Sequence, residues 1–313
     1  MLKKIVLIAG LVLSCCLIAG MFLSFSEDGK SIVREIGASF QSIEAVGLPD
    51  SLYFANERVP LENFDTKESL DREMLVNSYW HSQTIYLLKL STRYFPVIEP
   101  ILKREGVPDD FKYLALAESG LQQLISPAKA VGMWQILEAT AKEEGLEVSP
   151  EVDERYNVEK ATLVACNYLK RSYATYGNWT MAAASYNIGR TGLLKQATRQ
   201  DRYNYYDLLL GEETGRYMFR ILALKLIFQT PAHYGFDLTQ SDYYPALRFR
   251  EVEVDSSITR ISDFAAQMGT SYKMIKYFNP WLREASLNNP MKKKYTIKIP
   301  IDGFRTEAYI KNN

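Results

Sequence analysis

The chain has 313 residues, of which 47% are hydrophobic and 24% charged, as in an ordinary globular protein and unlike a disordered chain. Lysine plus arginine and aspartate plus glutamate both number 37, so the net charge is zero. That balance argues against a nucleic-acid partner, because such proteins rely on a basic excess. Cys15 and Cys16 lie in an apolar N-terminal run, so only Cys166 is left for the globular part, which excludes a cysteine-based zinc site there. The only histidines are His81 and His233, which argues against a multi-histidine metal site.

The first 26 residues are predicted to be a signal peptide or membrane anchor. Lys3 and Lys4 precede an uncharged, mostly apolar run over 5–25, the pattern of an export signal. The run is also long enough to span a bilayer, and Cys15 offers a site for lipidation, so cleavage, anchoring and lipidation stay open. In each case we expect the remaining chain in the periplasm or cell envelope, with the membrane contacted through this segment.

The middle of the chain is predicted to be all-α, because nothing in 61–230 alternates like a strand. Residues 61–95 contain no glycine or proline and precede Pro96 and Pro100, so we expect one or two long helices there. Pro108, with two aspartates behind it, marks another helix start. Further helices are expected at 155–176, 180–188 and 214–229.

The pattern changes after Pro231, where 232–247 is the expected linker. Alternating apolar residues predict short strands near 249–254 and 295–299, with two helix-length stretches around 258–268 and 271–278 between them. Strand, helix, helix, strand describes a small separate α+β module. The fold class is therefore mainly α, an all-α domain followed by this βααβ module.

Glu118 is the first candidate for chemistry. It continues the apolar stripe of the helix after Pro108, and Ser119-Gly120 follows at once, which places Glu118 at the helix end. Partial burial there would raise the pKa of the carboxyl and favour the proton-donating form. The alternative is a glutamate on the rim that simply reaches solvent.

Two further segments carry weaker signals. In Gly132-Met133-Trp134-Gln135, a glycine before a bulky pair and an amide suits a turn where backbone nears a ligand, or else a helix start with core side chains. In residues 181–189, three alanines allow close helix packing, and Tyr186 and Asn187 then carry polar tips inward or toward a cleft. A buried tyrosine with a satisfied hydroxyl is the plainer alternative.

Taken together, these motifs resemble the catalytic core of lytic transglycosylases of the soluble-lysozyme-like type. Glu118-Ser119 matches their catalytic Glu-Ser, and SPAKAVGMWQ (126–135) their Ser-Pro-x-Gly-Ala-x-Gly-x-x-Gln segment, with Lys129 at a usual glycine. The remaining matches are SYN (185–187), the Glu-Thr-x-x-Tyr helix in 212–227, and FANERVPLEN (54–63), which resembles the membrane-bound transglycosylase D subgroup. Residues 249–300 resemble a divergent LysM module, a glycan-binding fold.

The resemblance implies a division of the chain and an activity. It implies an extension over 27–80 that packs on the core, a lysozyme-like catalytic domain over 81–231 and a LysM-like module over 248–301. The implied enzyme cleaves the β-1,4 bond between N-acetylmuramic acid and N-acetylglucosamine in peptidoglycan without water, leaving 1,6-anhydromuramoyl ends. No metal and no organic cofactor is implied, and we expect a monomer. A hydrolytic muramidase and a non-catalytic wall-binding protein are the alternatives.

The resemblance also assigns roles to residues of this sequence. Glu118 would be the single general acid and base, and Tyr217 would hydrogen-bond its carboxyl. Glu213 is the first rival for a second carboxylate, and Glu138 a weaker one. The expected substrate-binding residues are Ser126 and Gln135 for the acetamido group or nearby hydroxyls, Gly132 and Met133 for the sugar subsite, and Tyr186 and Asn187 opposite Glu118.

Overall fold

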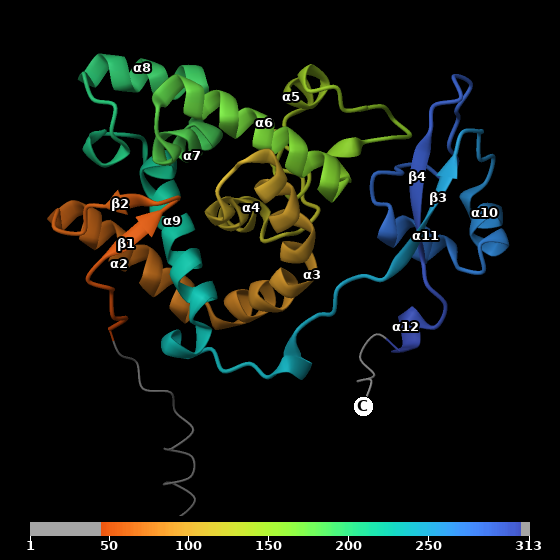
Figure 1. Cartoon of the computed structure of the whole chain (residues 1–313), viewed down its shortest axis with the longest axis horizontal. Coiled ribbons are helices and arrows are strands. Elements are labelled where there is room, and N and C mark those ends of the chain that lie inside the picture. Colours follow the sequence, from red (N-terminus) through yellow and green to blue (C-terminus); the bar gives the residue numbers. More distant parts are fainter. Residues whose placement is uncertain (1–44, 308–313) are drawn as a thin grey trace, which may run out of the picture. The chain divides into compact units, whose positions relative to one another are not determined.

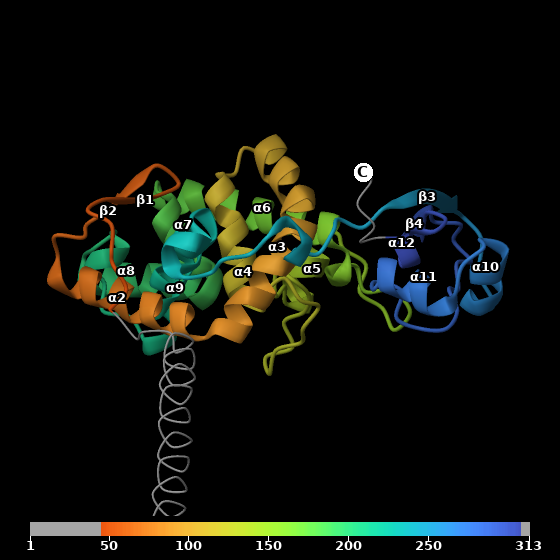
Figure 2. The same cartoon turned by 90° about the horizontal axis from the view of Figure 1, so that it is seen from below.

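The computed structural model describes residues 45–307, so the predicted targeting segment lies outside the described residues. Within 45–307, no helix is both long and apolar enough to cross a membrane. Helices make up most of the described chain, and its strands form two small sheets of two strands each. Figure 1 and Figure 2 show the arrangement from two directions.

The first and larger part of the structure is helical after a short hairpin. Its strands are β1 (Leu52–Phe54) and β2 (Glu57–Val59). Its helices are α2 (Phe64–Tyr79), α3 (His81–Glu105), α4 (Lys112–Ser119), α5 (Glu138–Glu143), α6 (Val158–Tyr176), α7 (Trp179–Ile188), α8 (Arg190–Gln200) and α9 (Glu212–Gln229). Short 3₁₀ turns lie at Asp109–Phe111, Glu154–Tyr156, Tyr205–Asp207, Pro231–Tyr234 and Gln240–Asp242.

The predicted helices α6, α7 and α9 are present, but α3 is longer than the prolines suggested. It continues through Pro96 and Pro100 to Glu105 and ends at Gly106 in the left-handed conformation. Ile98, Ile101 and Leu102 of its last turns are buried in the core, and this packing outweighs the hydrogen bonds that the prolines remove.

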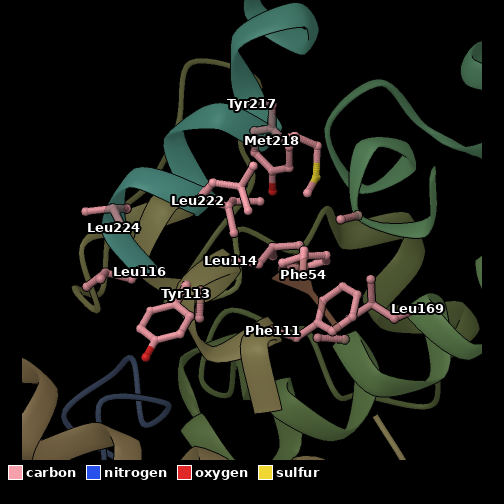
Figure 3. Close-up of a cluster of buried hydrophobic side chains, with 14 of the residues drawn as sticks. Phe54, Phe111, Tyr113, Leu114, Leu116, Leu169, Tyr217, Met218, Leu222 and Leu224 are labelled. Carbon is pink, nitrogen blue, oxygen red and sulfur yellow. The ribbon is translucent and has the colours of Figure 1, made fainter. Parts of the chain in front are cut away.

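Helix α4 lies in the middle of the helical part. It packs against α9 and α3, and Figure 1 shows it enclosed by the surrounding helices. Tyr113, Leu114 and Leu116 of α4 are buried, and Figure 3 shows them among side chains that come from α9 and from the β1 strand. The helix that ends at Glu118 is therefore held on several sides by the core.

The N-terminal hairpin is tied to the helical part by charged side chains that are buried or partly buried. Asp110 accepts hydrogen bonds from the Ala55 amide and the Lys225 ammonium, both at 2.7 Å, and Lys225 also donates to the Tyr53 carbonyl. Glu57 accepts from the Thr180 amide at 2.9 Å at the first turn of α7. The carboxylate of Glu57 therefore satisfies free amides at the positive end of that helix.

The second part is the predicted βααβ module. It consists of β3 (Phe249–Val254), α10 (Ile261–Gln267), α11 (Tyr272–Phe278) and β4 (Tyr295–Pro300), followed by α12 (Phe304–Glu307). Strands β3 and β4 pair antiparallel, from Phe249 opposite Pro300 to Val254 opposite Tyr295.

The expected linker and module both contact the helical part. Thr92 of α3 donates to the Tyr244 carbonyl at 2.9 Å, so the segment 232–247 lies along that helix. Val131, Val152 and Tyr156 of the helical part belong to the same buried cluster as the apolar side chains of the module. The module thus shares a hydrophobic core with the residues before α6.

Candidate active site

Glu118 occupies the last turn of α4, where its carboxyl is partly buried. The turn ends because Gly120 takes the left-handed conformation, with φ of 61°. This conformation favours glycine, and a Cβ at Gly120 would also lie 2.7 Å from the Leu87 side chain of α3, which would have to shift. As the sequence predicted, the carboxylate sits at the helix end on a stripe of buried side chains.

The hydroxyl of Tyr217 in α9 donates a hydrogen bond to Glu118 Oε1, although the two residues lie 99 positions apart in sequence. The Tyr217 side chain is fully enclosed, and Figure 3 shows it among the buried side chains of α9 and α4. This contact is the one that the family resemblance implies for the Glu-Thr-x-x-Tyr helix.

The surroundings of Glu118 raise the pKa of its carboxyl to about 7, chiefly through burial. The hydrogen bond from Tyr217 and the positive charge of Arg220 act in the opposite direction, and Glu213 adds a small further rise. At neutral pH a large fraction of the molecules therefore carries a protonated Glu118. This is the state that a general acid needs.

The loop over 126–136 passes beside the end of α4. Ser119 donates to the Met133 carbonyl at 2.8 Å, which ties the loop to the residue next to Glu118. Gln135 has a left-handed backbone with φ of 47°, and its side-chain amide donates to the Gly132 carbonyl at 2.8 Å. Ser126 closes the loop by accepting from the Ala130 amide at 3.0 Å.

Gly132 is needed for a close approach, but the neighbour is the protein itself. A Cβ at this position would lie 2.3 Å from the Arg155 carbonyl oxygen. Met133 is 1% exposed, and its side chain belongs to the hydrophobic core. The side chains of Ser126 and Met133 therefore hold the loop and the core, and a ligand here would meet the backbone of 132–133.

Tyr186 and Asn187 lie at the end of α7 on the wall of a pocket of about 290 Å³. Tyr186 donates to the Trp134 carbonyl at 2.8 Å, and Asn187 accepts from Thr214 of α9 at 2.7 Å. Burial raises the pKa of Tyr186 well above its ordinary value, and the charge of Glu118 adds to the rise. The pocket is lined by Gln135, Ile136, Leu137, Thr140, Val164, Ala165, Tyr168, Tyr186, Asn187, Ile188 and Gly189.

Two residues of this region were not singled out from the sequence. Tyr168 of α6 lines the pocket and meets Tyr186 edge to face, with ring centroids 5.2 Å apart. Arg220 lies one turn after Tyr217 on α9 and approaches Glu213 at 4.0 Å. The spacing of three residues from Tyr217 was the available signal for Arg220, because it puts both side chains on one helix face.

The two rival carboxylates differ from Glu118 in their surroundings. The Glu213 side chain is 72% exposed at the start of α9, and that of Glu138 is 55% exposed and pairs with Lys142 at 2.6 Å. Within 45–307, no group of three or more histidine, cysteine or acidic side chains is arranged to hold a metal ion.

Comparison with known proteins gives matches for both parts of the chain. Residues 95–209 match the family model of the transglycosylase SLT domain, and residues 250–303 match the soluble lytic transglycosylase C-terminal LysM-like domain. Membrane-bound lytic murein transglycosylase D of Escherichia coli, strains K12 and O6:H1, is 27% identical over 269 residues. A putative tributyltin chloride resistance protein of Alteromonas sp. is 28% identical over 120 residues, 36% of this chain and 58% of the relative.

The two Escherichia coli alignments cover 83% of this chain and 55% of the relative, so the chain spans about half the length of those curated relatives. The matched range 95–209 contains Glu118 and the loop that Ser119 holds. Tyr217, which donates to Glu118, lies just beyond the end of this range. The chain thus carries a transglycosylase SLT domain followed by a LysM-like domain of the soluble lytic transglycosylase type.

Proposed function

We propose that this protein is a peptidoglycan lytic transglycosylase with Glu118 as its only general acid and base. The observation that carries the proposal is the carboxyl of Glu118: burial raises its pKa to about 7, and its Oε1 accepts a hydrogen bond from Tyr217. The matches to the SLT domain and to lytic murein transglycosylase D support the same assignment.

In the proposed reaction, the protonated Glu118 gives its proton to the glycosidic oxygen between N-acetylmuramic acid and N-acetylglucosamine. The 2-acetamido oxygen of the muramoyl sugar stabilises the positive charge that develops at the anomeric carbon. Glu118, now a carboxylate, takes the proton from the 6-hydroxyl of the same sugar, and that oxygen attacks the anomeric carbon. No water is consumed, because a held hydroxyl has a high effective concentration.

The residues around Glu118 have matching tasks. Because Tyr217 occupies Oε1, Oε2 is the oxygen that would face the glycosidic bond. Gln135, Tyr186 and Asn187 line the pocket in which the sugar would sit, and Tyr186 also fixes the loop through the Trp134 carbonyl. The backbone at Gly132 and Met133, with Ser126 closing the loop, would complete the sugar subsite.

The test is digestion of purified peptidoglycan by the unmodified chain and by Glu118→Gln, followed by mass spectrometry of the released fragments. Products one water lighter than hydrolysed ends, absent with the variant, are the expected result. Hydrated ends would instead make the protein a muramidase and would turn attention to Glu213 as a second carboxylate. Wall binding without any release would identify a binding protein.

Attachment of the protein to a membrane is part of the same proposal. The two Escherichia coli relatives are described as membrane-bound, and the apolar run over 5–25 would supply the attachment in this chain. Fractionation of cells expressing the full chain and a form starting at residue 27 tests it, because only the full chain should sediment with membranes.

A further inference from the structure

We propose that the LysM-like module is an internal brace of the active-site loop, and that Arg155 is the positioning residue through which it acts. This inference rests on the proposed function of the loop over 126–136. It concerns how that loop keeps its shape rather than how the module binds glycan.

The module contacts one short segment of the helical part, residues 147–159. Two backbone hydrogen bonds join them, from the Asp153 amide to the Trp281 carbonyl at 2.9 Å and from the Arg283 amide to the Glu151 carbonyl at 2.7 Å. The Arg283 guanidinium also lies over the Tyr156 ring, 4.0 Å from its centroid. This strand-like pairing surrounds a shared apolar cluster that contains Val152 and Tyr156.

Charged pairs flank this contact on both sides. Lys293 of the module pairs with Glu147, which also accepts from the Tyr295 hydroxyl at 2.9 Å. Lys298 of β4 pairs with Glu159 at the start of α6. Both pairs place a module lysine against a glutamate of the helical part.

Arg155 carries the contact onward to the active-site loop. Its guanidinium makes two hydrogen bonds to the Asp153 carboxylate, at 2.9 and 2.7 Å, and Asp153 is the residue whose amide binds the module. The same guanidinium donates to the Lys129 and Ile136 carbonyls, at 3.3 and 3.4 Å. These two carbonyls stand at the two ends of the segment that contains Gly132, Met133 and Gln135.

The backbone of Arg155 acts on the middle of that segment as well. Its carbonyl oxygen lies 2.3 Å from the position that a Cβ of Gly132 would take, which leaves the loop no room to move toward it. Gln123, just before the loop, donates to the neighbouring Tyr156 carbonyl at 3.1 Å. Arg155 is buried, at 7% exposure, and an arginine fork in such a place fixes direction as well as distance.

A continuous path therefore runs from the Trp281 carbonyl through Asp153 and Arg155 to both ends of the loop and, by the Ser119 hydrogen bond, to the neighbour of Glu118. Misplacing groups beside a reacting bond by about 1 Å can lower a rate by as much as about 100-fold. Loosening the module should consequently slow cleavage even of glycans too short to reach it.

The test uses full-length charge-reversal variants, so that no part has to fold alone. Glu147→Lys with Glu159→Lys sets like charges against the module, and Lys293→Glu with Lys298→Glu does so from the other side. The fourfold variant restores both pairs with opposite polarity. We expect kcat/KM on a soluble, uncrosslinked glycan fragment to fall about tenfold or more in each double variant and to recover in the fourfold one.

Amide hydrogen exchange over 129–136 gives a readout that does not depend on activity. Exchange there should rise in both double variants and in Arg155→Lys, which keeps the charge but loses the fork, and should return to the original level in the fourfold variant. Unchanged exchange over 129–136 in all three would overturn the brace, as would raised exchange with an unaltered kcat/KM. An unmodified chain that is inactive on every glycan defeats the proposed function instead, and the exchange measurement still decides the brace.

Discussion

Replacing Tyr217 by phenylalanine removes the hydroxyl that donates to Glu118 Oε1 and leaves the buried ring in place. In the native protein this hydrogen bond lowers the pKa of Glu118, against the larger rise from burial, and the balance is about 7. Without it, the pKa of Glu118 should be higher. Hydrogen bonds to charged groups contribute about 1.5–3 kcal/mol, which corresponds to an upward shift of about one to two units.

The consequence appears in the pH profile. In the proposed function Glu118 acts as a general acid from its protonated form, so kcat/KM should fall as pH rises through the pKa of Glu118, which is about 7 in the native protein. In Tyr217→Phe this limb should move upward by about one unit or more. At pH 5, where both enzymes are protonated, kcat should be about tenfold lower because the carboxyl has lost its positioning contact.

The assay is release of soluble muropeptides between pH 5 and 9, measured by chromatography with product mass. Tyr176→Phe is the matched control, because Tyr176 is a buried tyrosine whose hydroxyl donates to the Arg190 carbonyl away from Glu118. A limb that stays near pH 7 in Tyr217→Phe, with the variant folded as judged by circular dichroism, would refute the reasoning.

Three further outcomes are expected. The pKa of Glu118 is higher in the folded protein than its ordinary value of 4.5, so the folded state loses stability as pH rises from 4.5 to 7. Glu118→Gln should therefore stabilise the protein by about 3 kcal/mol at pH 8 and by little at pH 4. Equal urea midpoints of the two proteins at pH 8 would contradict this. Gly132→Ala should lower activity severely and shift Tm downward, since its Cβ meets the Arg155 carbonyl; native activity would exclude that contact. Glu57→Ala should cost about 1–2 kcal/mol in urea unfolding by freeing the Thr180 amide, whereas Glu62→Ala, at an exposed pair, should change little.

Much of the helical architecture could be predicted from the spacing of apolar residues and from the glycines and prolines that end helices. Gly177 ends α6 in the left-handed conformation, and Pro231 follows α9, as their positions in the sequence indicated. The hairpin β1–β2 was missed because strands of three residues carry too little alternation, and α8 because Gly192 interrupts a largely polar stretch. α3 exceeded its predicted end because long-range packing, which no local pattern records, stabilises the turns after Pro96.

The site was predictable only in part. The apolar stripe gave Glu118 and the helix end, but the contact with Tyr217 spans 99 residues and was accessible only through the resemblance. The glycine in 132–135 was interpreted as a close approach of backbone to a ligand, but the atom that it approaches is the Arg155 carbonyl oxygen, which a single sequence cannot reveal. Nothing in the sequence distinguishes Arg155 from other charged residues, because only the fold brings its guanidinium to the carbonyls at both ends of the loop.

The ties of the N-terminal hairpin bear on how an expression fragment should be cut. A fragment limited to the matched range 95–209 would lose α9, and with it Tyr217. It would also lose Glu57 of the hairpin, which accepts a hydrogen bond from the first turn of α7. It would also leave Asp110 without Lys225, its buried counter-ion. A fragment that keeps the main buried cluster, and with it the contact between Tyr217 and Glu118, begins before Leu52 and continues past Phe236, the last fully buried residue of that cluster.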